Sequence, residues 1–366
     1  MDARTKKKIQ LISGIPRFHK HYRFGGNNAP LPMNFTVSLL YSCNSRCNTC
    51  NVYEKRVENL TLNEYDKIFS QLGEAPYWFT FSGGEPFLRK DIVDCVKLAY
   101  DHCKPGIINI PTNGSLYKVI PGRVEEMIDY CQESDIIINL SLDEIGEKHN
   151  KIRGFPGNWD RAMKTYEALS KFRDKPNFTL GIHTVISNFN VDNFPEIYKH
   201  LIKMDPDSYI TEIAEERVEL GTMAGGITPS YEKYKNVIDF LTAEMKKSKL
   251  HGVARIAQAF RLEYYEMVKR NLLEDKQIIP CFAGVTSCQI SPDGDVWPCC
   301  IRADSMGNLR EYNYDFKAIW NSRSAKKIRA SIKARECSCP LANASYTNLL
   351  VSPKSMTKIV SRLARP

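Results

Sequence analysis

The feature that most constrains the fold of this sequence is a repeated alternation of short β-rich runs and amphipathic stretches over residues 34–216. The runs are rich in Ile, Phe, Val and Thr, and we expect them to be apolar on both faces, as in buried parallel strands. The stretches between them space their apolar residues three or four positions apart, which is typical of helices that pack on one side. The alternation predicts an α/β fold, and six repeats predict a partial (β/α)6 barrel rather than a closed eightfold one.

The expected strands are 35–41, 78–82, 106–111, 135–142, 178–186 and 208–214. The expected helices are 61–72, 90–103, 121–133, 158–173 and 191–204, followed by 229–249 and 256–274. In parallel α/β barrels, chemistry takes place at the carboxyl ends of the strands. Four consecutive ends here carry polar or glycine-rich residues, which predicts one functional site: Cys43, the turn Gly83-Gly84-Glu85-Pro86, Asn113, and Ser141 with Asp143.

Basic residues are concentrated at the two ends of the 366-residue chain, whose net charge is +9. Residues 1–25 hold seven Lys or Arg and one acid, and residues 322–366 hold ten and one. Basic ends fit a solvated surface, an anionic lipid or a phosphorylated substrate. We expect no nucleic-acid partner, because no recognition-helix or stacking pattern accompanies the charge. The spacing of apolar residues over 353–365 predicts an amphipathic helix. This helix either docks on the protein or makes peripheral contact with an anionic membrane.

The N-terminus lacks the apolar segment of a signal peptide, and no apolar run approaches the ~18 residues that a membrane span requires. We therefore expect a cytoplasmic protein, with any membrane contact at the inner membrane face. The twelve cysteines are then expected to stay reduced rather than form disulfides.

Three cysteines form a tight group directly after the first expected strand: Cys43-x3-Cys47-x2-Cys50. A structural zinc site normally uses four protein ligands, and no local fourth ligand follows. A [4Fe–4S] cluster held by three cysteines leaves one iron open for an exogenous chelating ligand. The triad predicts such a cluster, with zinc as the alternative metal.

These motifs resemble the signature of the radical S-adenosylmethionine (SAM) superfamily over residues 34–216, namely CxxxCxxC, GGEP and a "SLDG…HDxIRG" stretch. The resemblance implies that the GGEP turn contacts the SAM amino group, and that Ser141 and Arg153 lie near its ribose or carboxylate. One departure is Thr49, where the family usually has an aromatic residue beside the adenine, and Tyr53 could substitute for it. The predicted cofactor-binding residues are Gly83, Gly84, Glu85, Pro86, Asn113, Ser141 and Arg153.

A second cysteine set surrounds a Pro292-Asp293-Gly294 turn, which predicts a hairpin of two short strands. This region resembles the SPASM/twitch extension of radical SAM enzymes, which binds auxiliary iron–sulfur clusters. We expect one auxiliary [4Fe–4S] cluster, with Cys288 and Cys300 as alternate ligands and zinc as the alternative metal. Its predicted ligands are Cys281, Cys299, Cys337 and Cys339.

The predicted organisation has five parts. They are a basic N-terminal extension (1–33), the radical SAM core barrel (34–216), a helical connection (217–280), the SPASM/twitch-like domain (281–345) and a basic C-terminal tail (346–366).

The resemblance implies an oxidoreductase that reductively cleaves SAM to a 5′-deoxyadenosyl radical and takes hydrogen from an unactivated C–H bond. We expect a small-molecule, sugar or lipid substrate, net oxidation through the auxiliary cluster, and an electron donor such as ferredoxin or flavodoxin. The alternative is a maturase for a ribosomal peptide or a sulfatase, ranked second because segment 1–33 is too short for a peptide-recognition domain. A non-catalytic metal-binding scaffold ranks third. Glu212, Glu215 and Arg217 are the candidate catalytic residues, with surface ion pairing as the alternative role.

Overall fold

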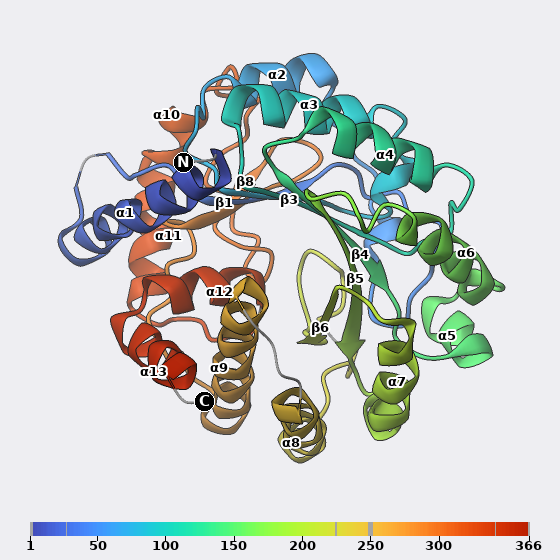
Figure 1. Ribbon diagram of the computed structural model, residues 1–366. Helices are drawn as coiled ribbons and strands as arrows, with labels where there is room; N and C mark the ends of the chain where they lie inside the picture. The colour runs from blue at the N-terminus through green and yellow to red at the C-terminus, as the bar shows by residue number, and fades with distance from the viewer. Residues whose placement is uncertain (1–2, 27, 224, 248–251, 341, 365–366) are drawn as a thin grey trace.

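The computed structural model describes residues 3–26, 28–223, 225–247, 252–340 and 342–364. Six parallel strands form a curved sheet that encloses a partial barrel (Figure 1). They lie within a few residues of the expected positions, which confirms the α/β barrel prediction. The strands are β1 (Asn34–Ser38), β2 (Trp78–Ser82), β3 (Ile107–Thr112), β4 (Asp135–Ser141), β5 (Phe178–Ile186) and β6 (Ser208–Ile213).

The predicted hairpin is present and continues the barrel sheet. Its first strand, β7 (Ser287–Ile290), pairs in parallel with β1, and its second, β8 (Val296–Trp297), runs antiparallel to β7. The full sheet order is β6-β5-β4-β3-β2-β1-β7-β8. The cysteine-rich region is therefore attached to the barrel through backbone hydrogen bonds to the strand that leads into the cysteine triad.

The two faces of the sheet differ in polarity, which corrects the expectation that the strands are apolar on both faces. One face carries fully buried apolar side chains such as Phe79, Ile108 and Ile138, which pack under the helices. The other face lines the barrel interior and is largely polar. Its side chains hydrogen-bond to one another, as where Asn139 Nδ2 donates to Asn109 Oδ1 at 2.7 Å. Polar residues are tolerated here because their partners are also on the inner face.

Helices cover the apolar face of the sheet (Figure 1). Their buried residues follow the expected spacing of three or four positions. The first of them is fixed by a capping box between Thr61 and Glu64. The barrel helices are α2 (Leu62–Phe69), α3 (Ile92–Cys103), α4 (Ile120–Tyr130), α5 (Gly146–Arg153), α6 (Asn158–Ser170) and α7 (Phe194–Leu201). Those outside it are α1 (Ala3–Phe24), α8 (Tyr231–Lys247), α9 (Gly252–Glu274), α10 (Phe316–Trp320), α11 (Arg323–Lys333), α12 (Ala342–Val351) and α13 (Pro353–Ala364).

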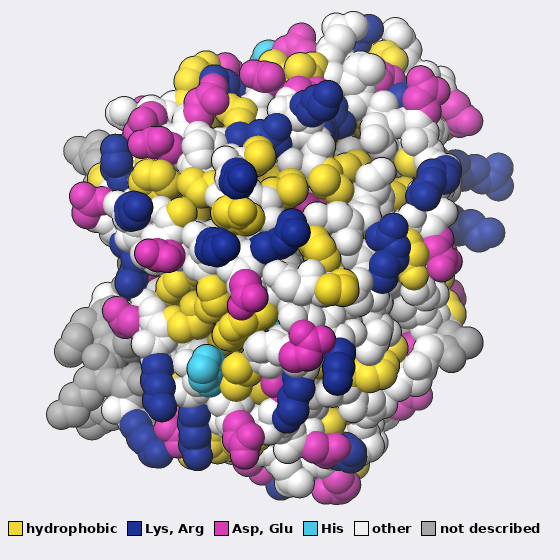
Figure 2. Space-filling view, turned by 90° about the vertical axis from the view of Figure 1, so that its right-hand side faces the viewer, with side chains coloured by type: hydrophobic (Ala, Val, Ile, Leu, Met, Phe, Trp, Pro, Cys, Tyr) yellow, Lys and Arg dark blue, Asp and Glu magenta, His cyan; other side chains and the backbone are white. Residues whose placement is uncertain are grey.

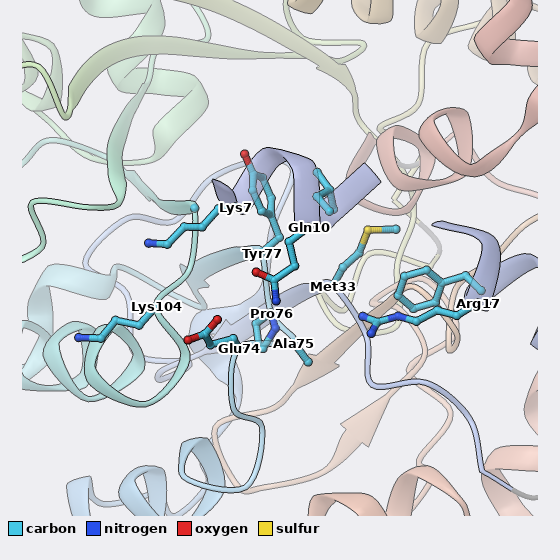
Figure 3. Close-up of a pocket in the computed structure, with 12 residues that line it drawn as sticks. Lys7, Gln10, Arg17, Met33, Glu74, Ala75, Pro76, Tyr77 and Lys104 are labelled. Carbon is cyan, nitrogen blue, oxygen red and sulfur yellow. The ribbon is translucent and has the colours of Figure 1, made fainter. Parts of the chain in front are cut away.

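The basic N-terminal segment forms α1, a helix that the sequence did not predict. Its cations bind backbone carbonyls in loops that precede strands: Arg4 donates to the carbonyl of Pro176 at 2.7 Å, and Lys7 to that of Glu133 at 3.2 Å. A cavity of about 280 Å³ lies beneath the helix, where Lys7 and Gln10 lie near Glu74 and Tyr77 (Figure 3). The helix therefore lies at the amino ends of the strands, opposite the cysteine triad.

The C-terminal segment forms the predicted amphipathic helix, α13, as far as residue 364, and the helix docks on α9. Ile359 is 1% exposed, and the carboxylate of Glu263 on α9 accepts from Lys358 at 2.8 Å and Arg362 at 3.4 Å. Much of the apolar stripe is thus covered by the protein itself, while Val360 stays exposed. No described helix is long and apolar enough to cross a membrane.

Charges of both signs are interspersed on the side of the molecule where α5 and α6 lie (Figure 2). No single-sign patch dominates this face. The basic excess of the chain comes from its two ends, where several of the cations already bind groups of the protein.

Because α13 docks on α9, alanine substitutions at two adjacent aliphatic residues should differ in their effect on the free energy of unfolding. Ile359→Ala should lower the free energy of unfolding by about 3 kcal/mol, because it leaves a cavity at the α9 contact. Val360→Ala, at an exposed site, should change it by less than about 0.5 kcal/mol. Urea unfolding of the two variants measures both values, and equal effects would contradict docking.

Candidate functional site

The cysteine triad lies on the loop that leaves β1, and each thiol accepts one hydrogen bond. Cys43 Sγ accepts from the backbone N–H of Ser45 at 3.4 Å, and Cys50 Sγ from that of Val52 at 3.5 Å. Cys47 Sγ accepts from Arg153 Nη1 at 3.8 Å. Burial raises the pKa of Cys43 to about 11 and that of Cys50 to about 12, so these groups stay protonated until a metal displaces the proton.

The end of α5 holds this loop in place. The backbone N–H groups of Arg46 and Asn48 donate to the carbonyls of Arg153 and Ile152, both at 2.9 Å. Gly154 ends the helix at φ +55°, and a Cβ there would lie 2.2 Å from the carbonyl oxygen of Arg46. The position therefore requires glycine for two reasons: its left-handed conformation and the close approach of the cysteine loop.

The GGEP turn after β2 packs against the same loop. Gly84 N–H donates to the Leu40 carbonyl at 2.7 Å, and a Cβ on Gly84 would lie 2.1 Å from the Ser42 carbonyl oxygen. A Cβ on Gly83 would meet the Leu40 carbonyl oxygen at 2.2 Å. These glycines thus let two loops approach each other closely. Pro86 begins the single helical turn that follows them.

Glu85 and Asn113 join the ends of β2 and β3 to the triad loop. The buried Glu85 carboxylate accepts from Thr112 Oγ1 at 2.7 Å and from the Asn113 N–H at 2.8 Å, while burial raises its pKa. Asn113 Nδ2 donates to Asn44 Oδ1 at 2.8 Å and to Ser45 Oγ at 3.1 Å. In this structure Asn113 braces the cysteine loop directly, and the Glu85 carboxylate holds the backbone of Asn113.

Ser141 lies at the end of β4, and Arg153 lies at the end of α5. Ser141 is the last residue of β4 on the inner face, and Arg153 Nη2 forms an ion pair with Asp143 at 3.0 Å. His149 fixes the neighbouring turn: it accepts from the Asp143 N–H and pairs with Asn158, while burial lowers its pKa to about 4. The sequence analysis named Asp143 as a strand-end residue and quoted His149 only as part of the motif, while it did not single out Asn158. Arg153 Nε lies buried without a partner, so this guanidinium can still bind a ligand.

Tyr53, considered as a substitute for the missing aromatic residue, stacks against the guanidinium of Arg46 at 4.2 Å. Its ring is engaged by the cysteine loop in this structure.

The carboxylates on and after β6 face the barrel mouth. Glu212 Oε1 lies 3.6 Å from His183 Nε2 on β5. Glu215 is 9% exposed, its Oε2 has no hydrogen-bond partner, and burial raises its pKa to about 7. Arg217 Nη1 donates to Cys300 Sγ at 3.5 Å. The ion-pairing alternative fits Glu212 better than Glu215, because no ion pair at 4 Å or less involves Glu215 among the described residues.

Sequence reasoning missed Glu219, a buried carboxylate in the same loop. It accepts from Ser38 Oγ on β1 at 3.2 Å and from the side-chain amide of Gln289 on β7. The loop after β6 therefore crosses the open side of the partial barrel. A lone glutamate in a turn carries no sequence signal that distinguishes it from a surface residue.

The structure gathers the four predicted auxiliary ligands and separates the two alternates. Cys281, Cys337 and Cys339 line one cavity. Burial raises the pKa of Cys299, and the nearby Cys281 and Cys337 raise it further. By contrast, Cys288 is paired in register with Phe35 and packs in the apolar layer. Cys300 faces Arg217. Within the described ranges, no three His, Cys, Asp or Glu side chains converge on a position for a single metal ion.

Two family models match this chain. The radical SAM superfamily model matches residues 37–201, and the SPASM model, an iron–sulfur cluster-binding domain, matches residues 281–340. The chain belongs to the radical SAM superfamily. A radical SAM enzyme with a SPASM domain uses SAM, a [4Fe–4S] cluster and auxiliary iron–sulfur clusters. The thiol-only donor sets and the buried, unpaired Arg153 Nε fit these groups.

Several characterised proteins are similar to this radical SAM enzyme. The antilisterial bacteriocin subtilosin biosynthesis protein AlbA of Bacillus subtilis is 24% identical over 88% of this chain and 67% of its own. An AdoMet-dependent heme synthase of Methanosarcina barkeri is 23% identical over 81% of this chain and 85% of its own length. Streptococcus suis SuiB bound to the precursor peptide SuiA shares the fold, with a TM-score of 0.60 and 16% identity over 86% of this chain and 69% of SuiB.

The contact at Gly154 predicts a specific loss of the triad cluster. Gly154→Ala should remove about half of the bound iron and abolish SAM cleavage, because its methyl group would collide with the cysteine loop. Gly157→Ala is the matched control: φ is +71°, but nothing lies within 4 Å of the added Cβ. It should cost only about 1 kcal/mol of stability and keep its iron. Iron analysis and release of 5′-deoxyadenosine distinguish the two variants.

Burial of Glu215 predicts a pH-dependent cost to stability. Because its folded pKa of about 7 is above the unfolded value, the folded state holds the proton more tightly and loses stability as pH rises from about 5 to about 7. Glu215→Gln should therefore gain stability over wild type through this range, by up to about 3 kcal/mol. Urea unfolding at pH 5 and pH 8 checks this. The exposed Glu125→Gln is the control, and an equal gain there would contradict the assignment.

Proposed function

We propose that this radical SAM enzyme is a maturase that oxidises a peptide or protein substrate at an unactivated C–H bond. The observation that carries the proposal is the similarity to the bacteriocin biosynthesis protein AlbA along 88% of the chain, which spans both the barrel and the SPASM region. The fold shared with SuiB, whose structure holds a precursor peptide, agrees with it.

This proposal reverses the order of the two substrate classes expected from the sequence. The small-molecule, sugar or lipid expectation relied in part on basic ends free to meet an anionic ligand. In the structure, Arg4 and Lys7 of α1 bind carbonyls, and Lys358 and Arg362 of α13 bind Glu263. Those cations are already engaged, so they no longer favour a lipid or phosphorylated substrate.

In the proposed enzyme, Cys43, Cys47 and Cys50 hold the first cluster and leave one iron for SAM. When bound, cluster and SAM together supply a 5′-deoxyadenosyl radical that takes a hydrogen atom from the substrate. Arg153 stays beside Cys47 and Asp143, where its charge offsets the negative charge of the thiolate ligands. The backbone hydrogen bonds of the triad loop to α5 and to the turn after β2 keep these groups in a fixed geometry.

The second cysteine set and Glu215 account for a net oxidation. Cys281, Cys299, Cys337 and Cys339 would hold an auxiliary cluster, whose chemistry is to accept or pass on an electron. Oxidation of a C–H bond also releases a proton. Glu215 is suited to accept it, because its free oxygen and its pKa of about 7 allow it to gain and lose a proton near neutrality.

A small-molecule substrate is the second candidate, and one observation favours it. The chain matches an AdoMet-dependent heme synthase over 85% of that protein's length. A tetrapyrrole is therefore the small molecule to test first.

The proposal predicts that peptides stimulate SAM cleavage. Anaerobically reconstituted enzyme, reduced by flavodoxin or ferredoxin, is incubated with SAM and either a pool of unmodified precursor-type peptides or an iron–porphyrin. Release of 5′-deoxyadenosine should rise several-fold with peptide, and mass spectrometry should detect a peptide that has lost two hydrogens.

The Cys43→Ala/Cys47→Ala/Cys50→Ala variant is the control. It should retain about four of about eight irons and release no 5′-deoxyadenosine, because it lacks the open iron. Stimulation by the iron–porphyrin alone would favour the small-molecule candidate over the peptide.

A further inference from the structure

Two side-chain amides face sulfurs of the second cysteine set. Asn348 on α12 donates from Nδ2 to Cys281 Sγ at 3.5 Å. Gln277 Nε2 lies 4.0 Å from Cys337 Sγ. The same nitrogen donates to the Cys337 carbonyl at 2.9 Å. Sequence reasoning singled out neither residue, because a lone Asn or Gln in a helix or loop carries no motif.

Asn348 is placed by its own second hydrogen bond. Its Oδ1 accepts from the Phe282 N–H at 2.8 Å, which orients the amide so that its NH₂ group faces Cys281. The side chain is 5% exposed, in a helix whose neighbouring Leu349 and Val351 are fully buried and apolar. Burying an amide is unfavourable unless both its oxygen and its NH₂ group are hydrogen-bonded. In Asn348 the oxygen is paired by Phe282 and the NH₂ group by Cys281.

The triad is surrounded differently. Its sulfurs accept from the backbone N–H groups of Ser45 and Val52 and from the Arg153 guanidinium. In the described part of the chain, no side-chain amide hydrogen bond to a triad sulfur is found. The amide contact thus distinguishes the second set from the first.

An N–H group directed at a ligand sulfur stabilises the more negative, reduced state of an iron–sulfur cluster and raises its reduction potential. We propose that Asn348 sets the potential of the auxiliary cluster and shifts it toward accepting an electron. This inference rests on one part of the proposed function, namely that Cys281 is a ligand of the auxiliary cluster. Asn348 is a positioning residue: it acts through Cys281 and contacts neither substrate nor SAM.

The test is Asn348→Asp in the full chain that also carries the triple alanine substitution of the triad, so that only the auxiliary cluster contributes a signal. Aspartate keeps the oxygen that accepts from Phe282 and replaces the NH₂ donor. Redox titration monitored by EPR should show a lower midpoint potential, equivalent to at least a tenfold change in the reduction equilibrium, or about 59 mV for one electron.

Asn271→Asp is the matched control. Asn271 lines the same cavity and is buried, but its Nδ2 donates to the Lys276 carbonyl rather than to a sulfur. It introduces the same charge without removing a sulfur hydrogen bond, so its shift should be clearly smaller. Equal shifts in the two variants, or no shift in Asn348→Asp, would overturn the inference.

Two further variants separate the inference from the proposed function. Cys281→Ala should lose the EPR signal, and a signal that persists would show that Cys281 is not a ligand. Asn348→Leu removes the donor without adding charge and should also lower the potential. If neither Asn348 variant binds the cluster, the residue is structural and the tuning role is overturned.

Discussion

Close backbone contact between the cysteine loop and its neighbours is the constraint on which the rest of the site depends. Three thiols can bind one cluster only if their loop keeps one conformation, and backbone hydrogen bonds from α5 and from the turn after β2 hold it there. The contacts are too close for side chains, since a Cβ at Gly83, Gly84 or Gly154 would lie about 2 Å from a carbonyl oxygen. Loss of one of these glycines therefore acts on the cluster without touching a ligand.

The loop after β6 connects the two cysteine sets. Its Leu220 carbonyl accepts from the Asn51 N–H next to Cys50, while Arg217 contacts Cys300 next to Cys299. The same loop carries Glu215, whose buried Oε2 has no hydrogen-bond partner in the described structure. Electron transfer between the sets and proton removal from a substrate would thus take place around one segment, attached at both ends to the sheet.

Part of the positive charge at the chain ends is used for docking. Cations of α1 bind carbonyls at the amino ends of the strands, and cations of α13 bind the buried Glu263. A buried carboxylate paired with two cations replaces solvation with direct hydrogen bonds. The net charge of this chain therefore says more about how its ends pack than about what it binds.

The sequence by itself determined the strand positions, the barrel class, the cysteine triad and the glycine-rich turn, because these depend on local periodicity and on motifs of a few residues. The tertiary structure decided where each thiol lies: Cys281, Cys337 and Cys339 line one cavity, whereas Cys288 packs in the sheet core and Cys300 faces Arg217, although both lie close in sequence to predicted ligands. It also showed that Asn113 braces the cysteine loop while Glu85 holds Asn113, that Glu219 joins the loop after β6 to β1, and that Asn348 faces Cys281. Such roles depend on contacts between residues far apart in the chain, and spacing along the sequence contains no information about them.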